Sequence, residues 1–281
     1  MAETRIAKLE NYGLLQAAGD DARAVLHAQL TNDIEHLQPG HARVAGWCSA
    51  KGRLLATFLV IPHAGGFLLQ LSSDLVPTVL KRLSMFVLRS KVKISDATGQ
   101  WAQFGVWGPD AGEPLAVREQ AGRIAVGVEP GRSLVLAAES ASAGFSPNTP
   151  AADWALAEVR AGRALIESST QDQFVPQMVN LELAGGVDFR KGCYPGQEIV
   201  ARAQYRGAVK RRMVRLRGAV LHAGQELYSD DLPGQPSGTV VNAAGEESLA
   251  VLQASSVAAK SAIRARPGDA PLEVLPLPYA R

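Results

Sequence analysis

Short apolar runs bounded by turn-forming residues recur along most of this chain. Tyr12–Ala18 is the first, and residues 54–61 and 67–71 flank the loop His63-Ala64-Gly65-Gly66, a pattern that predicts a β-hairpin. Further runs that favour strands are residues 101–107, 123–128, 133–138, 213–216, 238–241 and 249–253. The last three are separated by Gly, Pro, Asn and Asp turns, which predicts a small C-terminal β-barrel or sandwich.

Helical spacing of apolar residues interrupts these strand-like runs. Helices are predicted after the turn Gly19-Asp20, over residues 74–84 with Asp74 as N-cap, and over residues 153–162 with Asp153 as N-cap and Gly162 as the stop. Residues 87–95 alternate between apolar and basic side chains and predict a half-buried strand. Residues 140–152, rich in Ser, Ala and Pro, predict a linker. Together these patterns indicate an α+β fold with antiparallel strands.

The composition is that of an ordinary globular protein of 281 residues, 47% hydrophobic and 20% charged. A chain of this length needs no disulfide for stability. The two cysteines lie far apart in the sequence, and the five histidines fit no metal-ligand spacing, so we predict no structural zinc. No apolar run approaches the length of a membrane span, and the first ten residues lack the apolar core of a secretory signal. These features favour a reducing, cytoplasmic compartment and no membrane partner.

The stretch Lys191-Gly192-Cys193-Tyr194-Pro195-Gly196-Gln197-Glu198 combines a cysteine with turn-forming residues directly ahead of a predicted helix. Because proline is well tolerated at the first helical position, the helix is expected to begin near Pro195. The helix dipole, Arg190 and Lys191 would then favour the thiolate of Cys193. The alternative is that Cys193 is a small buried apolar residue with no chemical role.

The segment from residue 190 to residue 217 is strongly basic. Its cations are Arg190, Lys191, Arg202, Arg206, Lys210, Arg211, Arg212, Arg215 and Arg217, against the single acid Glu198. A solvated face, an anionic small ligand and the phosphates of a nucleic acid would each account for this charge. Only two aromatic residues, Tyr194 and Tyr205, lie among the cations, which gives little support for a single-strand stacking platform.

The motif around Cys193 also resembles a known family. The matching blocks are Asn180-Leu181, Gly185-Gly186-Val187-Asp188-Phe189, Lys191-Gly192-Cys193-Tyr194, Gly196-Gln197-Glu198, Val200-Ala201-Arg202 and Tyr205-Arg206-Gly207, with Gln29-Leu30-Thr31-Asn32-Asp33 and Lys51-Gly52-Arg53 further upstream. They resemble the YgfZ family, folate-binding relatives of the glycine-cleavage T-protein that are linked to iron-sulfur cluster assembly or repair. The resemblance implies a three-lobed aminomethyltransferase-like α+β fold around a channel for tetrahydrofolate. Residues 1–210 would form the two folate-binding lobes and residues 211–281 a C-terminal β-barrel lobe.

The resemblance also implies roles for individual residues. Two aromatic positions of the family's folate pocket correspond to Tyr12 and Trp154, although core packing is the ordinary use of such a tryptophan. Candidates for the edge of the pterin are Asn180, Glu182 and Gln197, and candidates for the glutamate tail are Arg202, Arg206 and Lys210. Cys193 and Lys191 would be the functional pair.

One departure from the family's relatives bears on catalysis. In the aminomethyltransferases, a strand near residues 54–58 carries acidic residues, whereas this chain has Leu54-Leu55-Ala56-Thr57-Phe58. We therefore expect no classical enzyme activity, but a tetrahydrofolate-binding accessory protein for iron-sulfur client enzymes, including tRNA-modifying enzymes, or their assembly factors. The alternatives are a folate-dependent one-carbon transferase and an RNA-binding module, although direct binding of nucleic acid is not expected. Pro195 replaces a threonine common in relatives, a change that suits the first helical turn.

Overall fold

The computed structural model describes residues 4–87, 89–109, 111–205 and 209–279, and the chain divides into two compact units. The first unit comprises Met1–Ala45 and Phe58–Trp154, and the second comprises Gly46–Thr57 and Ala155–Arg281. The short segment Gly46–Thr57 therefore packs with residues far along the chain. The predicted division at residues 210 and 211 stays a prediction.

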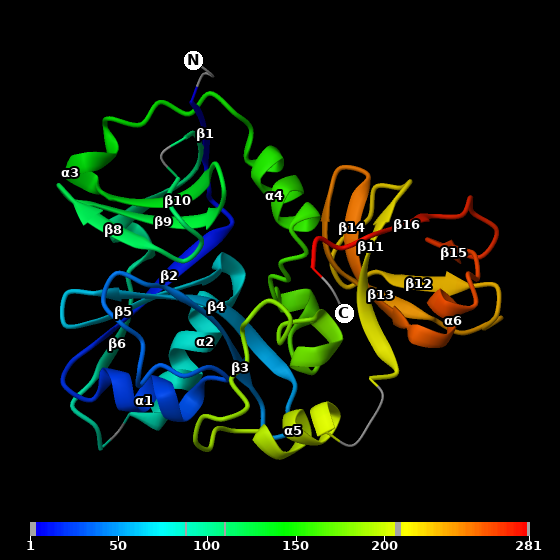
Figure 1. The fold of residues 1–281 in the computed structure, drawn as a ribbon, viewed down its shortest axis with the longest axis horizontal. Helices are drawn as coiled ribbons and strands as arrows, with labels where there is room; N and C mark the ends of the chain where they lie inside the picture. The colour runs from blue at the N-terminus through cyan, green and yellow to red at the C-terminus, as the bar shows by residue number, and fades with distance from the viewer. Residues whose placement is uncertain (1–3, 88, 110, 206–208, 280–281) are drawn as a thin grey trace. The chain divides into compact units, whose positions relative to one another are not determined.

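A five-stranded sheet of the first unit has the order β3-β4-β5-β2-β6. Its strands are β2 (Tyr12–Ala18), β3 (Arg43–Cys48), β4 (Leu54–His63), β5 (Gly66–Ser72) and β6 (Lys93–Asp96), and the first residues of β4 and the last of β3 belong to the second unit. β4 and β5 form the predicted hairpin, and β2 pairs antiparallel with both β5 and β6. Helices α1 (Ala22–Gln29) and α2 (Val76–Leu83) contact this sheet, as Figure 1 shows in blue and cyan.

The other sheet of the first unit has the order β1-β7-β10-β9-β8. It consists of β1 (Arg5–Lys8), β7 (Trp101–Trp107), β8 (Val117–Gln120), β9 (Arg123–Glu129) and β10 (Arg132–Ala138). β7, β9 and β10 confirm the predicted strands, and β8, β9 and β10 lie side by side in Figure 1. Phe104 on β7 stacks on Phe145 at 4.5 Å, which covers part of the sheet's apolar side.

The predicted strand over residues 87–95 is wrong in its first part. A 3₁₀-helix occupies Ser84–Phe86, and a turn follows in which the Ser90 amide donates to the Val87 carbonyl. The Asp21 carboxylate accepts the Lys91 N–H at 2.6 Å, and this hydrogen bond holds the turn against the start of α1. Only Lys93–Asp96 pairs as a strand, because the chain must first turn to run antiparallel to β2.

The predicted linker over residues 140–152 contains the end of one short helix and the start of another. α3 (Glu139–Ser142) opens the segment, and α4 (Ala151–Arg160) begins before the predicted N-cap Asp153. The Asp153 amide donates to the Pro150 carbonyl, so Asp153 already lies in the first turn, where its carboxylate pairs with Arg5 instead of capping the helix. Gly162, with φ of +69°, confirms the predicted end of this helix.

A six-stranded sheet in the C-terminal part of the second unit has the order β15-β12-β13-β14-β11-β16. Its strands are β11 (Arg211–Arg217), β12 (Glu226–Ser229), β13 (Gly238–Ala244), β14 (Glu247–Gln253), β15 (Ile263–Arg264) and β16 (Glu273–Leu275), drawn in yellow to red in Figure 1. A bridge between Ile263 and Leu272 links β15 to the residue that precedes β16, which nearly closes the sheet. The sheet is therefore barrel-like, as predicted.

The region before this sheet is largely irregular and ends in α5 (Gln197–Tyr205). Short 3₁₀-helices at Ser168–Thr170 and Pro176–Val179 interrupt it, and α6 (Ala254–Ala258) follows β14. The prediction that a helix begins near Pro195 is confirmed; α5 starts two residues later, at Gln197, because Gly196 has φ of +78°, which a right-handed helix does not accommodate. Within the described ranges, no helix has the length and apolar character needed to cross a membrane.

Candidate functional site

Two motifs of the sequence meet in the second unit at a contact between Gly52 and Gly196. A Cβ on Gly196 would lie 2.6 Å from the Gly52 Cα, and a Cβ on Gly52 would lie 2.8 Å from the Ile199 Cβ. Both glycines have positive φ, +68° and +78°, so each position excludes a side chain both by conformation and by space. The turn at residues 51–53 therefore packs directly against the start of α5.

Cys193 and Lys191, two residues apart in this motif, differ in exposure to solvent. Cys193 is exposed, which excludes the alternative that it is a buried apolar residue. Lys191 is only 8% exposed, and its ammonium lies 4.7 Å from the centre of the Tyr194 ring. Burial, together with Cys48 nearby, raises the pKa of the Tyr194 hydroxyl, so this ring stays neutral beside Lys191. Three residues separate Cys193 from α5, which places it beyond the helix's first turn.

The other cysteine, Cys48 at the end of β3, is a buried thiol. Burial raises its pKa to about 12, and the Asp172 carboxylate adds to this shift. Asp172 accepts a hydrogen bond of 2.8 Å from the Ser49 hydroxyl. Cys48 is therefore protonated at neutral pH, and the sequence contained no signal that would place Asp172 beside it.

A cluster of polar side chains surrounds Arg212 on β11. Its Nη1 donates to the Gln177 carbonyl at 2.9 Å, to the Asn180 Oδ1 at 3.1 Å, and to Oε1 of Glu182. Asn180 has φ of +55°, and its Nδ2 donates to the Met213 carbonyl at 3.0 Å. Arg212 thus holds the loop before α5 against the barrel-like sheet. Sequence reasoning counted it among nine cations without giving it this role.

The carboxylate of Glu182 is buried, and only one of its two oxygens accepts a hydrogen bond from a described residue. Its side chain is 6% exposed, and its Oε2 is buried without a hydrogen bond to any described residue. Gln177 offers a second such acceptor, because its Nε2 donates to the Val200 carbonyl while its buried Oε1 likewise has no described partner. An unsatisfied buried acceptor costs about 1–3 kcal/mol, so a hydrogen bond from an N–H donor to either oxygen would be stabilising.

The remaining predicted contacts of the second unit are Gln197, Arg202, Arg206 and Lys210. Gln197 is the half-buried first residue of α5, and Arg202 is exposed on the same helix. Among the described residues, no hydrogen bond or ion pair joins either of them to Glu182 or Asn180. Arg206 lies outside the described residues, and Lys210 is exposed.

Ion pairs offset part of the positive charge of the basic segment, residues 190–217. Several of its cations pair with acids that lie outside the segment: Arg190 with Asp188, Arg212 with Glu182, Arg215 with Glu247 and Arg217 with Glu273. Counting residues within one segment missed these partners because they come from neighbouring strands and loops. Among the described residues of the segment, these pairs offset part of the positive charge.

Both predicted aromatic contacts belong to the first unit. Trp154 is 3% exposed; the Arg132 guanidinium lies 4.4 Å from the ring centre, and Trp107 packs on it edge to face at 5.5 Å. Gly105 allows this packing, since a Cβ there would overlap the indole. Tyr12 is 9% exposed at the start of β2, and its carbonyl accepts a hydrogen bond from Gln103. Trp154 is thus a core residue, and its stacking on a ligand stays a prediction.

Comparison with known proteins links the chain to one family by sequence and to one fold by structure. The family model described as the GCVT N-terminal domain matches residues 3–121. The tRNA-modifying protein YgfZ of Klebsiella pneumoniae (strain 342) is 31% identical, over 97% of this chain and 92% of that protein. Its namesake from Edwardsiella ictaluri (strain 93-146) is 30% identical, over 98% and 92%.

Among solved structures, the glycine cleavage system aminomethyltransferase T from Bartonella henselae superimposes with a TM-score of 0.72, over 99% of this chain and 86% of that chain. Its sequence is 18% identical, so this likeness concerns the fold alone. The predicted aminomethyltransferase-like α+β fold is confirmed.

Proposed function

Because the chain belongs to the YgfZ family, we propose that it binds a reduced folate, tetrahydrofolate or a close relative, and supports the assembly or repair of iron-sulfur clusters in client enzymes. The curated relatives are named tRNA-modifying proteins, which favours tRNA-modifying enzymes among these clients. In this proposal the protein is an accessory factor, and the cluster is its cargo.

The observation that carries the folate proposal is the buried, half-satisfied carboxylate of Glu182. A pterin presents its 2-amino group and an adjacent ring N–H along one edge, and a carboxylate can accept both hydrogen bonds side by side. Oε1 already accepts from Arg212, whose cation offsets the charge of the buried carboxylate, while Oε2 is available. In this proposal Glu182 is the acceptor for the pterin edge, and Arg212 holds its carboxylate in place.

Asn180 has a different role in this arrangement. Both ends of its amide are occupied, since Oδ1 accepts from Arg212 and Nδ2 donates to the Met213 carbonyl. It positions the loop that carries Glu182 and remains a candidate for the pterin edge, because its amide keeps a second N–H and a second lone pair. Gln197, Arg202, Arg206, Tyr12 and Trp154 remain candidate folate contacts from the family resemblance, each to be tested by its own substitution.

Glu182→Gln tests the pterin contact directly. The amide keeps the shape of the side chain but loses the anionic acceptor, so we expect the dissociation constant for 5-formyltetrahydrofolate, measured by calorimetry, to rise at least about tenfold. Glu246→Gln, at an exposed position in the same unit, is the matched control and should bind as the wild type does. Equal affinities of the two variants would remove Glu182 from the site.

The exposed thiol of Cys193 supports the accessory role, because a partner protein can reach it without opening the fold. Complementation tests this in cells that lack the protein, with the activity of a [4Fe–4S] dehydratase as the readout. Cys193→Ala should fail to restore the activity, whereas Cys48→Ser, at the buried thiol, should restore it once its expression is matched. Full rescue by Cys193→Ala would show that the thiol is dispensable.

The residues of β4 argue against a one-carbon transferase. The corresponding strand carries acidic residues in aminomethyltransferases, but it carries none here. Leu54, Leu55, Ala56 and Phe58 are buried and apolar, and the hydroxyl of Thr57 accepts the Ile166 N–H at 3.1 Å. No carboxylate is present in this segment to assist group transfer. Transfer of a methylene group to tetrahydrofolate by the pure protein would reverse this conclusion.

A further inference from the structure

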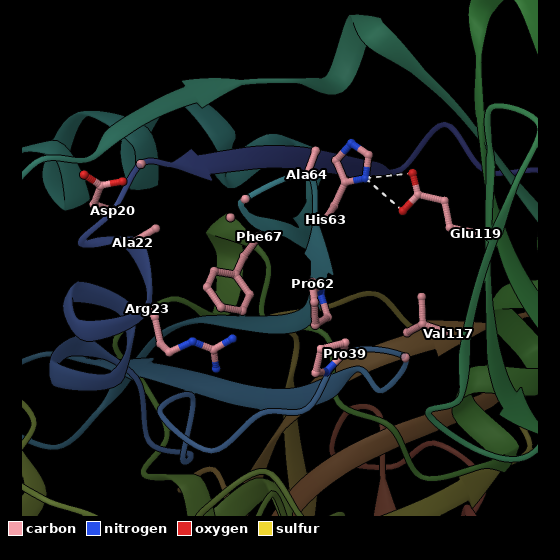
Figure 2. A pocket seen from close by; sticks show the side chains of 14 residues that line it. Asp20, Ala22, Arg23, Pro39, Pro62, His63, Ala64, Phe67, Val117 and Glu119 are labelled. Atoms are coloured by element: carbon pink, nitrogen blue, oxygen red, sulfur yellow. Dashed lines mark hydrogen bonds and ion pairs between the residues drawn. The ribbon is translucent and has the colours of Figure 1, made fainter.

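A cavity of about 560 Å³ opens in the first unit, between the start of α1, the turn that joins β4 to β5, and the edge strand β8. Figure 2 shows the Arg23 guanidinium and the Phe67 ring on one side of it, with Pro39, Pro62 and Val117 opposite. The folate proposal uses none of these residues. Prolines, a phenyl ring and a valine give the cavity mostly apolar walls, as small-molecule sites have.

Arg23 is held in one orientation at this cavity. Its Nη1 donates to the carbonyls of Ile34, Glu35 and Leu37 at 2.7, 3.0 and 3.0 Å, and the guanidinium lies 5.2 Å from the centre of the Phe67 ring. Its Nε and Nη2 make no hydrogen bond with any described residue. These two nitrogens form the edge of a guanidinium that binds a carboxylate through two parallel hydrogen bonds, and here that edge is already oriented.

Two acidic residues, Glu119 and Asp20, line the cavity together with this cation. Glu119 pairs with His63 Nδ1 at 3.2 Å, drawn as dashed lines in Figure 2, and the His63 ring is fixed edge to face on Trp101. The first turn of α1 contains no acidic residue, and the carboxylate of its N-cap residue Asp21 accepts the Lys91 N–H. Asp20 is the remaining carboxylate of the lining, on the turn before the helix.

We propose that this cavity binds a small organic acid with a planar, apolar body. The carboxylate would accept hydrogen bonds from Nε and Nη2 of Arg23, and the body would lie against Phe67, Pro39 and Pro62. The site is independent of the proposed folate contact at Glu182, which belongs to the other unit.

The probes that test this site are benzoate and its neutral isostere benzamide. We expect benzoate to cause saturable shifts in the amide NMR spectrum of the full chain, centred on Arg23, Gly65 and Val117, and benzamide to bind at least about tenfold more weakly. Arg23→Lys should weaken benzoate binding by a similar factor, because an ammonium cannot form the paired hydrogen bonds. Equal affinity for the two probes, or no saturable shift, would overturn the proposal.

Arg23→Lys could also disturb the local structure, because Arg23 donates hydrogen bonds to three backbone carbonyls. A second variant therefore tests the cavity without changing Arg23. Val117→Trp on β8 should fill the cavity without touching Arg23 and should abolish the benzoate shifts. Val128→Trp, at a half-buried valine of the same sheet outside the lining, is the matched control and should keep them. Benzoate binding that survives Val117→Trp would place the ligand elsewhere.

Discussion

Gly52 and Gly196 pack backbone against backbone, and neither position has room for a methyl group. We predict that Gly196→Ala lowers the free energy of unfolding by about 2 kcal/mol more than Gly234→Ala does. Gly234 is a matched control, because its φ of +77° equals that of Gly196 within one degree while its surroundings are open. Denaturant unfolding followed by circular dichroism measures both variants, and equal losses would show that the close approach is unimportant.

The burial of Trp154 against Gly105 and Arg132 predicts a large structural effect. Trp154→Ala should lower the free energy of unfolding by about 3–5 kcal/mol, because it leaves a cavity in the core of the first unit. Trp101→Ala, at a half-buried tryptophan of the same unit, should have a smaller effect. Thermal unfolding is the measurement, and folate binding should be compared with Trp154→Phe, which keeps an aromatic ring. Similar losses for the two alanine variants would contradict the core role.

The ion pair between Arg160 and Glu247 predicts an acid-sensitive contribution to stability. The hydrogen bond from Arg160 lowers the pKa of Glu247 by more than burial raises it. The positive charges of Arg160, Arg215 and Arg217 lower this pKa further. A carboxyl whose pKa is lower in the folded state stabilises the fold above its unfolded pKa of about 4.3, and that stabilisation is lost as the pH falls through the folded value.

The unfolding free energy of the wild type should therefore decline below about pH 4.5 more steeply than that of Glu247→Gln, when both are measured by urea denaturation between pH 7 and pH 3. Glu246→Gln, in the exposed neighbouring position, should decline as the wild type does. Parallel curves for wild type and Glu247→Gln would show that the pair is not linked to folding.

The two cysteines should differ sharply in reactivity. Cys193 is exposed, whereas Cys48 is buried with its pKa raised to about 12. Brief treatment of the folded protein with iodoacetamide at pH 8 should modify Cys193 alone, because the thiolate is the nucleophile and Cys48 is protonated and covered. Peptide mass spectrometry reports the two sites separately, and treatment in guanidinium is the control in which both react. Early modification of Cys48 in the folded state would refute its burial.

Local patterns predicted most strands because alternation and turn residues act over a few positions. β2 agrees with its predicted bounds, and β7 and the β4–β5 hairpin agree closely. The errors arose where distant contacts override local preference. Residues 89–92 would alternate well in a strand, but Asp21 holds the backbone at Lys91 in a turn, and Leu88 lies outside the described residues. The carbonyl of Pro150 starts α4 before the expected cap at Asp153.

The motif around Cys193 identified the family because its residues are contiguous in the sequence. The spacing of apolar residues in strands and helices was sufficient to predict the α+β class. Sequence could not distinguish the two cysteines by burial, find the partners of the basic run, or reveal that one oxygen of Glu182 is buried and unsatisfied. Those properties belong to the tertiary structure, since burial and ion pairing depend on side chains that are far apart along the chain and meet only when it folds.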